Sequence, residues 1–155
     1  MPTDINLDRL IAARFEHTGT WRRNEVGNAV CEGRPPDSPG VYVFVVDRTV
    51  RYVGSAQKSL SARMQSYARR QQQRDKDKLQ SNRLVHRKLG EAIDKKNAVV
   101  DVYTLVINDP IENERGLPVD HAIGLEGGLI RAVDPAWNRR GRKKKRLVLD
   151  DIDDT

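Results

Sequence analysis

Residues 40 to 67, GVYVFVVDRTVRYVGSAQKSLSARMQSY, hold the patterns that decide the fold of this chain. An apolar, β-branched run over 41–46 is bounded by turn-forming residues, which is typical of a buried strand. A shorter run over 50–54 follows a polar link of about three residues, a separation that favours a hairpin. From Leu60 to Tyr67 the apolar residues recur at helical spacing. The stretch predicts a strand, a second strand of a hairpin, and a helix.

The same stretch places four polar side chains where they can meet. Tyr42 and Tyr52 lie on the two predicted strands, and Arg63 and Tyr67 are four residues apart on one face of the helix. Tyrosines are common in strands, and an arginine on a helix is usually solvated, so each residue alone indicates little. Together they predict three phenols and a guanidinium near one edge of a small sheet.

These residues resemble the signature of the GIY-YIG nucleases. Residues 40–42, GVY, stand for GIY, and residues 52–54, YVG, stand for YIG. An arginine and a tyrosine on the following helix, and a later glutamate and asparagine, stand in the order of the family, over roughly residues 36 to 140. The resemblance assigns an active site to Tyr42, Tyr52, Arg63, Tyr67, Glu126 and Asn138.

The resemblance also implies a fold and an activity. The expected fold is α/β (α+β), with a small three-stranded mixed or antiparallel sheet flanked by helices. The expected function is a DNA endonuclease that depends on a divalent metal, with Glu126 as the ligand of Mg²⁺ or Mn²⁺ and Tyr42 as general base or relay. The alternative is a nucleic-acid-binding module that keeps the GIY-YIG fold with little or no cleavage activity.

Glu126 is unusual on pattern alone. It falls within the apolar stripe of a predicted helix over 119–133, where a carboxylate is costly unless it is paired or holds a cation. An ion pair with an arginine such as Arg63 and a metal site both remain open. One departure from the family is Ser55, at a position where excision-repair members often have a lysine; the nearest lysine here is Lys58.

The rest of the chain divides around this region. We expect an N-terminal helix and arm over 1–35, the nuclease domain over 36–140, and a basic then acidic tail over 141–155. The elements expected outside the signature are a helix within 5–15, a loop or arm over 18–39 with at most a short strand near 25–30, a third strand over 98–107, and a loop over 108–118. A further helix is expected after a cap at Ser81, with an apolar stripe over 84–93 that His86 borders.

Composition points to a polyanionic partner. The chain has 155 residues, 32% of them charged, and a formal net charge of +6, so we expect DNA, duplex or branched, as its partner. No apolar run approaches the ~20 residues that span a bilayer, which predicts a cytoplasmic protein with no membrane partner. A homodimer is an open alternative. The candidate DNA contacts are Arg69, Arg70, Arg74, Arg139, Arg140, Arg142, Lys143, Lys144 and Lys145. A solvated surface explains the first three equally well, and a basic run such as 139–146 is most often a solvated tail.

Overall fold

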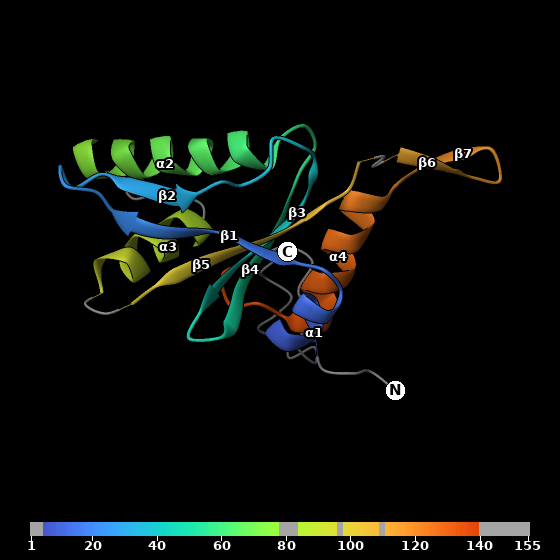
Figure 1. The fold of residues 1–155 in the computed structure, drawn as a ribbon, viewed down its shortest axis with the longest axis horizontal. Helices are drawn as coiled ribbons and strands as arrows, with labels where there is room; N and C mark the ends of the chain where they lie inside the picture. The colour runs from blue at the N-terminus through green and yellow to red at the C-terminus, as the bar shows by residue number, and fades with distance from the viewer. Residues whose placement is uncertain (1–4, 78–83, 96–97, 109–110, 140–155) are drawn as a thin grey trace, which may run out of the picture.

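The computed structural model describes residues 5–77, 84–95, 98–108 and 111–139. Its main feature is a five-stranded antiparallel sheet in the order β2-β1-β5-β3-β4, with helices on both faces (Figure 1). The strands are β1 (Glu16–Arg23), β2 (Ala29–Gly33), β3 (Gly40–Val46), β4 (Thr49–Ala56) and β5 (Val100–Val106). The helices are α1 (Leu7–Ala12), α2 (Leu60–Asp77), α3 (Leu84–Asp94) and α4 (His121–Val133). The expected α+β fold is confirmed.

Strand β3 is the strand around which the two faces are built. It pairs with β5 on one side and with β4 on the other, and six of its seven residues are buried. Its β-branched run reflects burial on both faces of the sheet. Asp47 and Arg48, both with positive φ, form the tight turn into β4. The strand, hairpin strand and helix predicted from residues 40–67 are confirmed.

Alternate residues of β3 belong to two separate cores. Tyr42 and Phe44 pack with side chains of α2 and α3, whereas Val41, Val43 and Val45 pack with side chains of α1 and α4. In Figure 1, α2 and α3 accordingly lie on one side of the sheet and α1 and α4 on the other. No helix within the described ranges is long and apolar enough to cross a membrane.

The loop or arm expected over 18–39 is wrong, as is the count of about three strands. Residues 16–33 form β1 and β2, and β1 pairs with β5 in the same sheet as the signature strands. Trp21 explains why: its side chain is 1% exposed and packs on Phe44 and Tyr67, with ring centroids 6.2 and 6.4 Å away. One buried aromatic side chain anchors a strand whose other residues are mostly polar, so no apolar alternation marked it.

The loop expected over 108–118 is also wrong. Strands β6 (Ile111–Glu114) and β7 (Leu117–Asp120) form a second, two-stranded sheet that projects from the body just before α4 (Figure 1). Arg115 and Gly116 form its turn, both with positive φ. Such turns usually carry Asn-Gly or Asp-Gly, so the Arg-Gly pair gave a weak hairpin signal.

The segment after α4 closes the outer edge of the main sheet. Asn138 is buried; its Oδ1 accepts a hydrogen bond from the Val53 N–H, and its Nδ2 donates one to the Val53 carbonyl, each 2.9 Å long. The Trp137 N–H donates to the Arg51 carbonyl at 2.8 Å. These bonds pair the edge of β4 and fix the C-terminal end of α4 against the sheet.

Replacing Asn138 should therefore destabilise the fold. Asn138→Ala is expected to lower the free energy of unfolding by about 2–4 kcal/mol, because each buried backbone group that loses its partner costs about 1–3 kcal/mol. Urea unfolding measures the change. Asn113→Ala, at a position of the projecting β6 strand, is the matched control and should change stability little. Equal losses in the two variants would contradict the bracing role of Asn138.

Candidate active site

Three phenols from three elements meet on the face of the sheet that α2 covers. The Tyr42 hydroxyl from β3 lies 2.7 Å from the Tyr67 hydroxyl from α2, within hydrogen-bond distance. The ring of Tyr52, from β4, lies 6.1 Å from that of Tyr42 and 6.5 Å from that of Tyr67. Tyr42 and Tyr67 are buried, and Tyr52 is half-buried. The structure thus brings together the three tyrosines that the sequence singled out.

The two glycines of the signature are required by close packing. A Cβ on Gly54 would lie 2.4 Å from Cζ and 2.5 Å from the hydroxyl oxygen of Tyr42, which faces it across the β3–β4 ladder. A Cβ on Gly40 would lie 2.1 Å from the Leu105 carbonyl oxygen of β5. Any side chain at either position would displace a strand or the Tyr42 ring. The GVY and YVG triplets therefore specify where the Tyr42 hydroxyl lies.

The buried phenols remain neutral in the free protein. Burial raises the pKa of Tyr42 far above its ordinary value, and the neighbouring Tyr52 raises it further, while the hydrogen bond with Tyr67 and the charge of Arg63 lower it less. Burial likewise raises the pKa of Tyr67. The structure therefore does not favour Tyr42 as a phenolate base and leaves it a neutral donor and acceptor, consistent with the expected relay.

Glu126 comes from α4, a helix whose N-terminus is capped by the Asp120 carboxylate at 3.0 Å from the Ile123 N–H. The Glu126 side chain is half-buried, and its Oε1 accepts a hydrogen bond from Ser55 Oγ at 2.9 Å. Burial raises the pKa of Glu126, opposed in part by the bond from Ser55 and by the charge of Arg63. Sequence reasoning assigned no role to Ser55, which here orients the glutamate.

Arg63 is exposed on α2. Its charge acts on the pKa of both Glu126 and Tyr42, although α2 and α4 cover opposite faces of the sheet. This is consistent with both side chains lying near β4, which is the edge strand. Within the described residues Arg63 and Glu126 form no ion pair, so the structure does not support the alternative of a buried pair between them.

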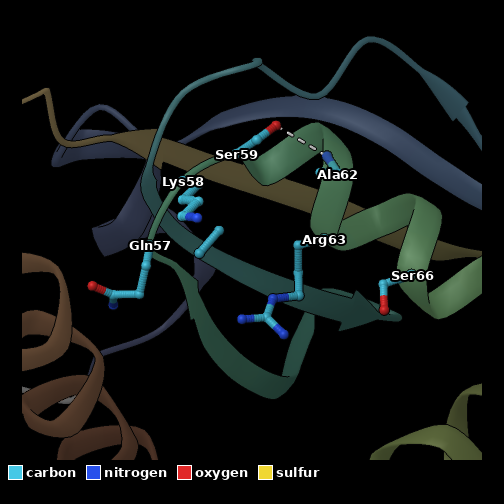
Figure 2. A pocket seen from close by; sticks show the side chains of 7 residues that line it. Gln57, Lys58, Ser59, Ala62, Arg63 and Ser66 are labelled. Carbon is cyan, nitrogen blue, oxygen red and sulfur yellow. Dashed lines mark hydrogen bonds between the residues drawn. The ribbon is translucent and has the colours of Figure 1, made fainter.

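A pocket of about 300 Å³ opens beside Arg63 (Figure 2). It lies between the β4–α2 loop and the first turns of α2, where the Ser59 hydroxyl caps the helix by accepting from the Ala62 N–H at 3.0 Å. The labelled lining residues are Gln57, Lys58, Ser59, Ala62, Arg63 and Ser66. The pocket adjoins the tyrosine and glutamate cluster without including it.

The remaining candidates lie elsewhere. Asn138 is a positioning residue, because its amide group bonds to Val53 rather than entering the cluster. Arg69, Arg70 and Arg139 lie at the surface, consistent with DNA contact or with solvation. The expected contacts that lie outside the described residues or side chains are Arg74, Arg140, Arg142, Lys143, Lys144 and Lys145.

Sequence reasoning placed His86 at the border of an apolar stripe, but the structure buries it. Its ring lies 4.8 Å from the Tyr67 ring, and its carbonyl accepts from Gln71 Nε2 at 2.6 Å. It therefore packs behind the phenol cluster and supports the position of Tyr67. A helical pattern cannot separate a border position from a core position when a neighbouring aromatic ring completes the burial.

Comparison with known proteins finds solved structures with a similar fold. No family model and no curated protein matches the sequence. A mutant of EndoII from bacteriophage T4 has 15% identity and a TM-score of 0.66, over 87% of this chain and 100% of that one. Restriction endonuclease HPY188I with product DNA has 17% identity and a TM-score of 0.51, over 92% and 88% of the two chains.

A third solved structure is the GIY-YIG domain of UvrC from Thermotoga maritima bound to magnesium. It has 30% identity and a TM-score of 0.41, over 68% of this chain and 88% of that one. The fold likeness to the first two structures agrees with the signature in this sequence. Its two triplets lie on the paired strands β3 and β4, in register at one position, where Tyr42 is opposite Gly54. The chain therefore has the GIY-YIG nuclease fold.

Proposed function

We propose that this protein is a divalent-metal-dependent DNA endonuclease that hydrolyses phosphodiester bonds at the cluster of Tyr42, Tyr52, Arg63 and Glu126. The observation that carries the proposal is the half-buried Glu126 carboxylate, held by Ser55 and under the influence of the Arg63 charge. A desolvated carboxylate next to a cationic side chain suits a site where a phosphate and a cation meet. The neighbours EndoII and HPY188I are endonucleases by name, and HPY188I was solved with product DNA.

The donor set fits Mg²⁺ or Mn²⁺. No group of three or more His, Cys, Asp or Glu side chains that could hold a metal occurs in the described part of the chain. Mg²⁺ commonly keeps several waters and takes other ligands from substrate phosphate, so the single carboxylate of Glu126 suffices. When bound, the cation would offset negative charge on the phosphate and lower the pKa of a bound water.

The chain's own residues supply the other parts of the chemistry. The Arg63 guanidinium, exposed beside the cluster, is placed to donate two hydrogen bonds to non-bridging oxygens of the scissile phosphate. The hydroxyls of Tyr42 and Tyr67 form a neutral hydrogen-bonded pair that can orient an attacking water. Because both phenols stay neutral, they can only relay the proton of that water, which would pass to an oxygen of the substrate phosphate. Ser55 fixes the rotamer of Glu126, and Asn138 fixes the strand that carries Ser55.

The alternative is a nucleic-acid-binding module without efficient cleavage. One observation favours it: burial keeps Tyr42 neutral, so this tyrosine is not poised as a strong base in the free protein. The enzyme therefore requires another route for activating water: a bound cation would lower the pKa of a bound water, and the DNA phosphate would accept the proton. Incubation of the purified protein with plasmid and branched DNA, with Mg²⁺ or with EDTA, separates the two: cleavage only with Mg²⁺ supports the enzyme, and binding without cleavage supports the module.

Glu126→Gln should slow cleavage strongly without harming the fold. Loss of the ligand charge is expected to lower the cleavage rate by roughly 10²–10³-fold, while DNA affinity stays similar or rises. Because burial disfavours the charged form of Glu126, the melting temperature without metal should be unchanged or higher. Glu91→Gln, at an exposed position of α3 paired with Lys88, is the control and should cleave normally. A strongly destabilised Glu126→Gln variant would indicate a structural ion pair instead.

The raised pKa of Glu126 predicts a pH-dependent difference in stability. In the metal-free fold the carboxyl binds its proton more tightly than in the unfolded chain. The contribution of this protonation to the free energy of unfolding is therefore fully present below the ordinary pKa of 4.5. That contribution is lost as the pH rises through the higher pKa of the folded state. In EDTA, unfolding free energies of wild type and Glu126→Gln should therefore converge at acidic pH and diverge, in favour of the variant, toward neutral pH. Divergence in the opposite direction would contradict a raised pKa.

The C-terminal basic residues should contribute to salt-dependent DNA binding. Removing residues 139–155, which include seven cationic residues at 139–146, is expected to flatten the slope of log K against log salt by roughly 0.9 for each phosphate that these residues neutralise. Fluorescence anisotropy over a salt series measures the slope. Asn138 is retained, so the melting temperature should hold. An unchanged slope would mean that this segment is solvated in the complex.

A further inference from the structure

The pocket beside Arg63 contains a second positive charge, that of Lys58, to which the proposed reaction assigns no role. Its walls carry two cationic side chains, Lys58 on the β4–α2 loop and Arg63 on α2, and no carboxylate (Figure 2). Lys58 is exposed, and no ion pair of Lys58 or Arg63 occurs among the described residues. Two uncompensated cations around one hollow of about 300 Å³ favour an anion.

The anion would be recognised by side chains rather than by the end of the helix. The first backbone N–H groups of α2 already have acceptors: Leu60 donates to the Ser38 carbonyl and Ser61 to the Pro36 carbonyl, each at 2.9 Å. The Ala62 N–H donates to Ser59 Oγ at 3.0 Å. The side-chain donors on the pocket wall are the Lys58 ammonium, the Arg63 guanidinium, the Gln57 amide and the hydroxyls of Ser59 and Ser66. Of these, Lys58 and Arg63 carry the positive charge.

The location of the pocket limits which phosphate can enter it. Arg63 belongs both to the pocket wall and to the cluster around Glu126, whereas Glu126 and the tyrosines do not line the pocket. If Arg63 contacts the scissile phosphate, the next phosphate of the same strand follows about 3.4 Å along the duplex axis. A hollow near the small end of known ligand sites, which begin at about 300 Å³, has room for one phosphate and part of its sugar.

We infer that this pocket binds the phosphate adjacent to the scissile one on the cleaved strand, with Lys58 as its principal ligand. The inference rests on the proposed function. In this inference Lys58 does not replace the lysine that often follows the YIG triplet in excision-repair members. Lys58 instead holds the DNA strand so that the scissile phosphate contacts Arg63. Phosphate contacts of this kind fix register and carry no base sequence, so the subsite would serve any sequence the protein cuts.

The test asks whether the contribution of Lys58 to DNA affinity depends on the charge of one particular phosphate. The cut is first mapped on a labelled duplex with wild-type protein and Mg²⁺. Four duplexes are then made: one all-phosphate, one with a neutral methylphosphonate at the linkage immediately 5′ of the cut, one with it immediately 3′, and one with it several linkages away. Affinities are measured by anisotropy for Glu126→Gln alone and with Lys58→Ala, Lys58→Arg or Lys95→Ala added. Lys95 is exposed near the end of α3 and lies outside the pocket.

Lys58→Ala should weaken binding of the all-phosphate duplex roughly tenfold and flatten the salt slope by about 0.9. On the duplex that is neutral at one linkage next to the cut, the same substitution should change affinity by less than about twofold, because the partner charge is already gone. Lys58→Arg should restore most of the affinity. Lys95→Ala should have a small effect that is equal on all four duplexes. Melting temperatures check that each variant is folded.

The outcomes distinguish the subsite from the function on which it rests. A Lys58→Ala penalty that is equal on all four duplexes, or no larger than that of Lys95→Ala, overturns the adjacent-phosphate subsite while cleavage by the wild type upholds the nuclease. A penalty that disappears only with the distant neutral linkage also overturns it, because the Lys58 partner then lies elsewhere on the strand. Wild-type protein that cuts no DNA contradicts the proposed function and this inference together.

Discussion

The contact between the Tyr42 ring and the backbone of Gly54 is the constraint on which the site depends. The two residues face each other across the β3–β4 ladder, and no side chain larger than hydrogen fits between them. The ring is thereby held in the core, where the Tyr42 hydroxyl reaches Tyr67 on α2. The position of α2 relative to the sheet is thus tied to the same contact, and with it the position of Arg63, one turn before Tyr67. A larger residue at position 54 would displace the Tyr42 ring from its place beside Tyr67.

The edge strand β4 takes part in three different sets of interactions. Gly54 accommodates the Tyr42 ring, the Ser55 hydroxyl orients Glu126, and the Val53 backbone bonds to Asn138. Successive residues of a strand face opposite sides of the sheet, so one short segment can serve a cluster on one face and a carboxylate from a helix on the other. At an edge strand, groups from both faces of a sheet can approach the same substrate. The Asn138 bonds also cover an edge that would otherwise expose unpaired backbone groups.

The sequence was sufficient to predict the central elements because their patterns are local. The buried run of β3, the hairpin into β4 and the helical spacing from Leu60 each follow from a few consecutive residues. Strand β1 could not be predicted in this way, since its stability comes from Trp21 packing on distant side chains. The β6–β7 hairpin was missed because Arg115-Gly116 is an uncommon pair for its turn. In both segments tertiary contacts or unusual turn residues outweighed local propensity. The order of residues along the chain selected the three tyrosines that the structure brings together, but it also selected Asn138, which bonds to β4 instead. The hydrogen bond from Ser55 to Glu126 could not be predicted, because it depends on register: a shift of one residue in β4 would turn Ser55 to the other face.

The electrostatics of the free protein explain why a substrate and a cation would complete the site. Burial raises the pKa of Tyr42, of Tyr67 and of Glu126 and so disfavours the charged form of each, while the cationic Arg63 side chain lies exposed beside them. In the proposed enzyme this cationic side chain would attract a phosphate. A bound divalent cation would offset the charge of both the phosphate and the Glu126 carboxylate, and would thereby lower the cost of ionising a half-buried acid. Phosphate and cation would therefore each favour binding of the other, and hydrolytic chemistry would be confined to the complex in which both are present.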